Sequence, residues 1–218
     1  ISTSRKRAQD DDADEEECYY HFTREYTAEE IEEGWKRKGA IARDRGTEGH
    51  WLCECFFNGL PVRWWEPEMA VLFDFIRQYL LPRGIVGYNT EKEISCAEAD
   101  VAGSIDLIVY EPATGMHHII DFKRSDKLQV QMHGYKKMKP PLNHLDDCKG
   151  AAYALQTGIY QWVLEREYGM KIGDRILLSI HPDKPFATSV PYLKAEVEFV
   201  MENRIALTRA RRAVQEAF

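Results

Sequence analysis

Two carboxylates and one amine, those of Asp106, Asp121 and Lys123, lie near the middle of the chain. Two carboxylates that share a small volume repel each other unless a cation lies between them, and a hard divalent ion with oxygen ligands suits that position. A lysine beside such an ion can orient a bound water molecule or stabilise the charge that develops on phosphorus. Hydrolysis of a phosphodiester bond needs these parts, with Mg²⁺ as the physiological ion and Mn²⁺ as its usual substitute.

The segment that carries these residues is typical of a β-hairpin. Two stretches within residues 103–123 are dominated by β-branched and apolar side chains, and the connector 111–115 contains Pro and Gly. Because alternate residues of a strand share a face, Asp121 and Lys123 point the same way. Antiparallel pairing then brings Asp106 beside them.

Hydrophobic periodicity predicts the elements around this hairpin. A capping box of Thr27 and Glu30 begins a first helix, which we expect Gly39 to interrupt. Residues 124–149 lack periodicity, and so long a loop within a domain is usually functional or mobile. We expect an α/β (α+β) fold with a mixed β-sheet flanked by helices. The predicted helices cover residues 27–38, 47–57, 66–81, 150–168 and 194–216, and the predicted strands outside the hairpin cover 85–96, 175–181 and 187–192.

Composition and charge limit the class of protein. The chain has 218 residues, 44% of them hydrophobic, which suits one main domain of residues 21–218. Residues 1–20 are basic and then acidic, so we expect a disordered tail or linker. Arg5-Lys6-Arg7 resembles a nuclear-import signal, but three basic residues in a row commonly occur by chance. The chain begins with Ile, so we expect a module of a longer polypeptide.

The same sequence predicts an intracellular protein, nuclear or cytoplasmic. It contains no apolar run long enough for a membrane span and no signal-peptide pattern. Its five cysteines are odd in number and scattered, which argues against a disulfide framework. The net charge of -7 is concentrated in the first residues and does not exclude nucleic acid as a partner.

The predicted helix 47–57 offers a further ligand. His50 would add a nitrogen donor, which favours Mn²⁺ without excluding Mg²⁺. Glu54 lies one helical turn further on the same face. The neighbouring Cys53-x-Cys55 pair is compatible with zinc, but a structural zinc site needs four ligands and no second pair is near in the sequence.

The loop after Lys123 is basic, since residues 123–149 contain seven Lys or Arg and three Asp. Its position directly after the predicted catalytic strand favours contact with a polyanionic substrate. A solvated surface is the alternative. We expect phosphate contacts from Arg124, Lys127, Lys136 and Lys137, and base stacking on Tyr135.

Five short motifs follow one another between residues 27 and 181. They are Gly46-Thr47-x-x-His50, Glu93, Gly103-x-Ile105-Asp106, Asp121-Phe122-Lys123 and Gln156-x-x-x-Tyr160. This series resembles the PD-(D/E)xK nuclease superfamily, and within it the RecB-like branch, which includes nuclease domains of bacterial recombination helicases. The resemblance implies a restriction-endonuclease-like core and a single nuclease domain.

The resemblance also implies roles for individual residues. Metal ligands would be His50, Asp106, Asp121 and the backbone carbonyl of Phe122, and the catalytic residues would be Asp106, Asp121 and Lys123. Gln156 and Tyr160 would support the site and hold the substrate strand, while Glu54 and Glu93 would lie just outside the ligands. Many members carry an iron–sulfur cluster fastened partly by a cysteine trio near the C-terminus. This chain has no cysteine after Cys148, so we expect no such cluster.

The resemblance implies DNA as the substrate, as single strands or at ends, because RecB-like relatives tend to act on such DNA. Cleavage of RNA by the same site stays open, as does the choice between exonuclease and endonuclease action. A non-enzymatic alternative also stays open, in which a catalytically silent domain binds nucleic acid or a partner protein.

Overall fold

The computed structural model describes residues 26–125 and 127–216. The predicted charged tail of residues 1–20, with Arg5-Lys6-Arg7, lies outside them. The chain divides into two compact units, residues 1–41 and 42–218. Of the long helix α2 (Ala28–Phe57), residues 28–41 belong to the first unit and residues 42–57 to the second.

The expected interruption at Gly39 is wrong, because α2 is one continuous helix. A single glycine costs only about 1 kcal/mol relative to alanine in a helix interior. The N-terminus of α2 has the predicted capping box, in which the Thr27 Oγ1 accepts from the Glu30 amide and Glu30 Oε2 accepts from the Thr27 amide.

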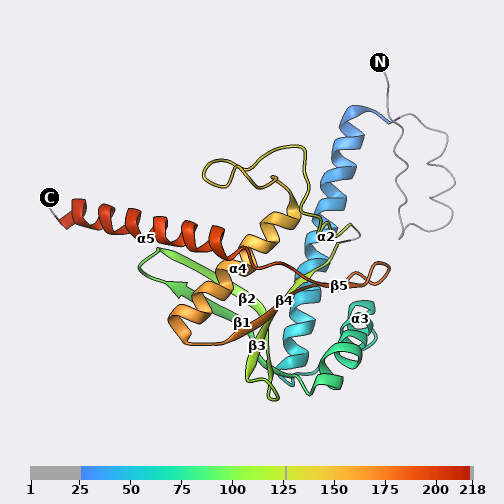
Figure 1. The fold of residues 1–218 in the computed structure, drawn as a ribbon. Helices are drawn as coiled ribbons and strands as arrows, with labels where there is room; N and C mark the ends of the chain where they lie inside the picture. The colour runs from blue at the N-terminus through green and yellow to red at the C-terminus, as the bar shows by residue number, and fades with distance from the viewer. Residues whose placement is uncertain (1–25, 126, 217–218) are drawn as a thin grey trace. The chain divides into compact units, whose positions relative to one another are not determined.

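The second unit contains a five-stranded mixed sheet in the order β1-β2-β3-β4-β5 (Figure 1). Its strands are β1 (Val86–Cys96), β2 (Val101–Glu111), β3 (Met116–Lys123), β4 (Ile172–Ser179) and β5 (Phe186–Ser189). All neighbours are antiparallel except β3 and β4, which are parallel and are joined by a connection that contains helix α4 (Lys149–Tyr168). This confirms the predicted mixed sheet and the predicted hairpin.

Helices cover both faces of the sheet. On one face α2 and α3 (Pro67–Phe75) contribute to a core with the sheet residues Leu107, Ile120 and Leu178. On the other face α4 and α5 (Lys194–Glu216) contribute to a core with Ile105, Ile108 and Ile119. The predicted α+β fold with helices flanking a mixed sheet is therefore confirmed.

The predicted helix 66–81 ends earlier than expected. After α3 the chain continues as a π-helical turn, η1 (Ile76–Leu80), and a 3₁₀ turn, η2 (Leu81–Arg83). Pro82 removes a backbone donor and Gly84 adopts a left-handed conformation, which together end the helix. No helix within the described residues is long and apolar enough to cross a membrane.

Candidate metal centre

His50 reaches the sheet because α2 packs closely against the end of β4. The preceding residue, Gly49, is buried, and an added Cβ there would lie 2.6 Å from Cδ1 of Ile180. The His50 ring meets the Phe122 ring edge-on, with 5.8 Å between centroids. Its Nδ1 lies 3.6 Å from Oδ2 of Asp106. The glycine thus permits the close approach that brings the imidazole to β2.

Asp106 and Asp121 lie opposite each other where the pairing of β2 and β3 ends. Leu107 pairs with Ile120, and one position further the two aspartates would be the next pair. At that position a side chain takes the place of a backbone acceptor in the ladder. Oδ2 of Asp106 accepts a hydrogen bond of 2.6 Å from the backbone N–H of Phe122. The strand ends therefore open around two carboxylates.

Glu91 extends this acidic row onto β1. Thr90 pairs with Leu107 and Lys92 with Ile105, so Glu91 lies opposite Asp106. Its backbone has a left-handed φ of 44°, which costs a residue with a Cβ roughly 1–2 kcal/mol. Its Oε2 accepts a hydrogen bond of 3.0 Å from the Ser104 hydroxyl.

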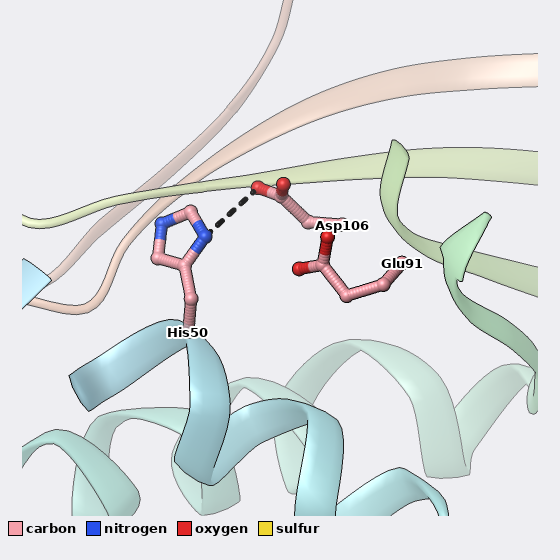
Figure 2. Close-up of side chains that lie close together, drawn as sticks. All are labelled: His50, Glu91 and Asp106. Atoms are coloured by element: carbon pink, nitrogen blue, oxygen red, sulfur yellow. Dashed lines mark ion pairs between the residues drawn. The ribbon is translucent and has the colours of Figure 1, made fainter. Parts of the chain in front are cut away.

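His50, Glu91 and Asp106 form a candidate cation site. Each offers one ligand atom, and these atoms all lie within 4.8 Å of one another (Figure 2). Two ligands of one Mg²⁺ ion, each about 2.1 Å from it, can be at most about 4.2 Å apart. Small side-chain adjustments are therefore enough for the three groups to share an ion, and one nitrogen with two carboxylates suits Mn²⁺ or Mg²⁺.

Asp121 and Lys123 lie directly beside this cluster on β3. Asp121 is 4% exposed, and its Oδ2 forms an ion pair with the Lys123 ammonium. The ammonium also lies 5.5 Å from the centroid of the Tyr153 ring. Asp121 thus adds a buried carboxylate, paired with the Lys123 ammonium, next to the acidic row.

Burial and, to a smaller extent, the neighbouring Asp121 charge raise the pKa of Asp106 to about 6. His50, the Phe122 amide and Lys123 act in the opposite direction but do not offset these effects. The site therefore holds more negative charge than its own cations neutralise, which is the electrostatic condition for binding a divalent ion.

Gln156 and Tyr160 come from α4 and meet at this end of the sheet. The Gln156 amide donates a hydrogen bond of 2.9 Å to the Tyr160 hydroxyl. An added Cβ on Gly103 would lie 2.9 Å from Cε1 of Tyr160. Burial raises the pKa of Tyr160, and the charges of Asp121 and Asp106 also raise it. Gly103 thus makes the room that lets Tyr160 lie beside the aspartates.

The predicted phosphate-binding residues of the loop have different surroundings. The Arg124 Nε lies 2.8 Å from Oε1 of Glu68, and both side chains are largely buried. The Lys137 ammonium lies 2.5 Å from Oδ1 of Asp146. Lys127, Lys136 and Tyr135 are exposed. The structure thus gives Arg124 and Lys137 carboxylate partners, and the role of all five in substrate binding stays a prediction.

Glu54 and Glu93 are outside the cluster of His50, Glu91 and Asp106. Glu93 is exposed and pairs with Ser104 in the β1–β2 register. Glu54 is half-buried on α2, and within residues 26–125 and 127–216 its side chain forms no hydrogen bond or ion pair. The acidic residue of β1 that joins the cluster is Glu91, which the sequence motifs did not single out.

The cysteines beside His50 belong to the protein interior. Cys53 is fully buried and Cys55 is 4% exposed. Burial, with smaller contributions from the charges of Asp106 and Glu68, raises the pKa of the Cys53 thiol to about 12. Among the described residues, neither cysteine belongs to a group of three or more side chains placed to hold a metal ion.

Comparisons with known proteins give no family. No family model matches the chain, and no curated protein matches it. One similar solved structure is a "putative exonuclease" from Eubacterium rectale, with a TM-score of 0.44 and 14% identity over 76% of this chain and 67% of that one. Another is SSO0001, with a TM-score of 0.28 and 21% identity over 63% of this chain and 56% of that one. At these TM-scores neither likeness assigns a function to the chain, so a function has to be inferred from the geometry of the site.

Proposed function

We propose that this protein is a divalent-metal-dependent nuclease of the PD-(D/E)xK superfamily, RecB-like branch, that hydrolyses phosphodiester bonds in DNA. The observation that carries the proposal is the acidic row of Glu91, Asp106 and Asp121 at the open end of the sheet, with His50 and Lys123 at its sides. An isolated Asp-x-Lys is common on solvated strands. An Asp-x-Lys that lies beside a second aspartate, a glutamate and an imidazole from three other elements is uncommon on such strands.

His50, Glu91 and Asp106 would hold the ion, joined by Asp121 and the Phe122 carbonyl as the resemblance implies. When bound, Mg²⁺ or Mn²⁺ supplies a Lewis acid that activates water and neutralises charge on the phosphate. Lys123 carries a positive charge beside Asp121, where it can stabilise negative charge on a phosphate oxygen. Tyr160, held by Gln156, offers a hydroxyl for orienting the substrate strand.

A cleavage assay with end-labelled oligonucleotides tests this function. Single-stranded and double-stranded DNA and matched RNA are incubated with Mg²⁺, Mn²⁺ or EDTA. We expect metal-dependent cleavage, with DNA preferred and single strands or ends cut first. Cleavage should be lost in Asp121→Asn and Lys123→Ala and retained in Lys171→Ala, an exposed lysine just before the opposite end of β4.

The outcomes separate the alternatives. A preference for RNA would keep the site and change the substrate. Mn²⁺ binding and cleavage both missing from the intact protein would favour a silent binding domain. Cleavage that survives both site substitutions would show that the activity does not come from this site.

A further inference from the structure

A cavity of about 280 Å³ lies beyond the C-terminal ends of β3 and β4. The loop after β3 lines one side with Lys127, Leu128 and Gln131, among others. The segment after β4 lines the other side with Lys184 and Phe186. This volume is near the lower end of small-ligand sites, about 300–1,000 Å³, so the cavity suits one nucleotide rather than several.

The strand register connects this cavity to the candidate metal centre. Lys123 pairs with Ser179 across β3 and β4, and Ser179 pairs with Phe186 across β4 and β5. Paired residues share a face of the sheet, so the side chains of Lys123 and Phe186 lie on the same side. Two strand spacings separate them by about 10 Å. At about 3.4 Å per nucleotide of a stacked strand, this distance spans at most about three nucleotides.

The side chains of the cavity suit the two parts of a nucleotide. Phe186 is 45% exposed on an edge strand, where an aromatic face is available to a base. Lys127 and Lys184 are exposed, and neither forms an ion pair with a carboxylate in the part of the chain that the structure describes. Two ammonium groups near one aromatic ring match a phosphate joined to a base.

The loop side of the cavity rests on the N-terminus of α4. The Cys148 thiol donates a hydrogen bond of 3.4 Å to the Gln131 carbonyl oxygen. An added Cβ on Gly150 would lie 2.6 Å from the Val130 carbonyl oxygen and closer still to that of Gln131. Gly150 therefore allows the loop to pack on the helix, which fixes this wall in place.

We propose that this cavity is a subsite for one nucleotide of the substrate strand, about one to three nucleotides from the phosphate that is cut. Phe186 stacks on the base, and Lys127 and Lys184 bind flanking phosphates. The proposal rests on the proposed nuclease function for the position of the scissile phosphate, but binding of the nucleotide is measurable without cleavage.

Oligonucleotide binding to the full chain carrying Lys123→Ala, which keeps the strand uncut, tests the aromatic contact. Loss of base stacking on an aromatic ring typically weakens binding by about 5- to 150-fold, so Phe186→Ala should raise the Kd for a labelled single strand by that factor. Phe186→Tyr should retain tight binding. Phe199→Ala is the matched control, because Phe199 on α5 is 47% exposed and lies outside the cavity.

A scan with abasic nucleotides identifies the stacked base. Removing one base at a time should reveal a single position at which Phe186→Ala has no further effect, since the ring then has no partner. Lys184→Ala should reduce the slope of log Kd against log salt by about 1, whatever the sequence. Lys171→Ala, before the opposite end of β4, should leave that slope unchanged.

Equal Kd values for the parent and for Phe186→Ala would overturn the subsite, as would a penalty that persists with every abasic strand. Failure of the nuclease function looks different. In that case the wild-type protein cuts nothing with Mg²⁺ or Mn²⁺, while binding still depends on Phe186. A protein that cuts DNA and binds it equally well without Phe186 keeps its function and loses only the subsite.

Discussion

Asp106 and Asp121 face each other one position beyond the end of the β2–β3 ladder, where the Asp106 carboxylate accepts the Phe122 amide. Asp106 therefore has a structural role in addition to the ligand role that we propose for it. We expect Asp106→Asn, which keeps an acceptor for that amide, to fold while losing Mn²⁺ affinity and cleavage together. Calorimetric titration with Mn²⁺ and a cleavage assay measure the two losses.

Lys123→Ala should separate activity from metal binding. The ammonium is a donor beside Asp121 and cannot ligate a cation, so its removal should lower cleavage by about 10²- to 10³-fold, as for other groups that stabilise developing charge. The Mn²⁺ affinity should be retained or increased, because a competing positive charge is gone. Loss of Mn²⁺ binding in this variant would contradict the assignment.

Glu91 and Glu93 form a matched pair for testing the third ligand. Both are glutamates of β1, but only Glu91 lies within ligand distance of His50 and Asp106. We expect Glu91→Gln to weaken Mn²⁺ binding by at least about 10-fold, a loss of the size seen when groups around a metal are removed. Glu93→Gln should bind as the parent does. Equal effects of the two changes would mean that the row of carboxylates acts only through its total charge.

Gly103→Ala should damage the site by displacing Tyr160. The new methyl group would lie 2.9 Å from the ring, and overpacking of this kind costs about 1–3 kcal/mol. Denaturant unfolding should show this loss, and the double variant Gly103→Ala/Tyr160→Ala should show less than the sum of the single losses. Gly46→Ala is the control, because nothing lies within 4 Å of its added Cβ and alanine favours the helix by about 1 kcal/mol.

The buried Glu68–Arg124 pair should stabilise the connection between α3 and the end of β3. Glu68→Leu leaves the Arg124 charge largely buried without a partner, and such changes typically cost about 3–5 kcal/mol. The double variant Glu68→Leu/Arg124→Met should recover most of that loss in denaturant unfolding. A double variant as unstable as the single one would argue that shape rather than charge matters here.

The pKa of Asp106 predicts how stability depends on pH without metal. Its folded-state pKa of about 6 exceeds the ordinary value of 3.8, so the charged form is disfavoured in the folded protein. In EDTA the ionisation of Asp106 should lower the free energy of unfolding as pH rises from about 4 to about 6, by an amount on the order of 1–3 kcal/mol. Asp106→Asn should raise the melting temperature at pH 8 and change it little at pH 4. Asp183→Asn, an exposed carboxylate, is the control.

The sequence predicts the hairpin and the relative placement of its charged residues well, because period-two alternation and turn residues are local signals. Asp121 and Lys123 share a face as expected, and Asp106 lies opposite Asp121. The predicted helix break at Gly39 was wrong. The free-energy cost of one glycine is smaller than the stabilisation that α2 gains from continuous backbone hydrogen bonding.

The contribution of Glu91 to the candidate cation site was not predictable in the same way. Alternation places Glu91 and Glu93 on one face, and nothing local distinguishes them. Their difference depends on the strand register and on the left-handed backbone at Glu91. Arg124 presents a similar difficulty, since its partner Glu68 is distant in sequence and only the packed structure shows that this charge is paired.

The position of Glu91 on an edge strand has a kinetic consequence. Among the described strands β1 pairs with β2 alone, and elements with few partners open at a lower free energy than the core in native-state exchange. An ion shared by Glu91, Asp106 and His50 would fasten this strand to its neighbour and to α2. Amide deuterium uptake along Val86–Cys96 should therefore slow when Mn²⁺ is added, so that the free edge reports on occupancy of the site.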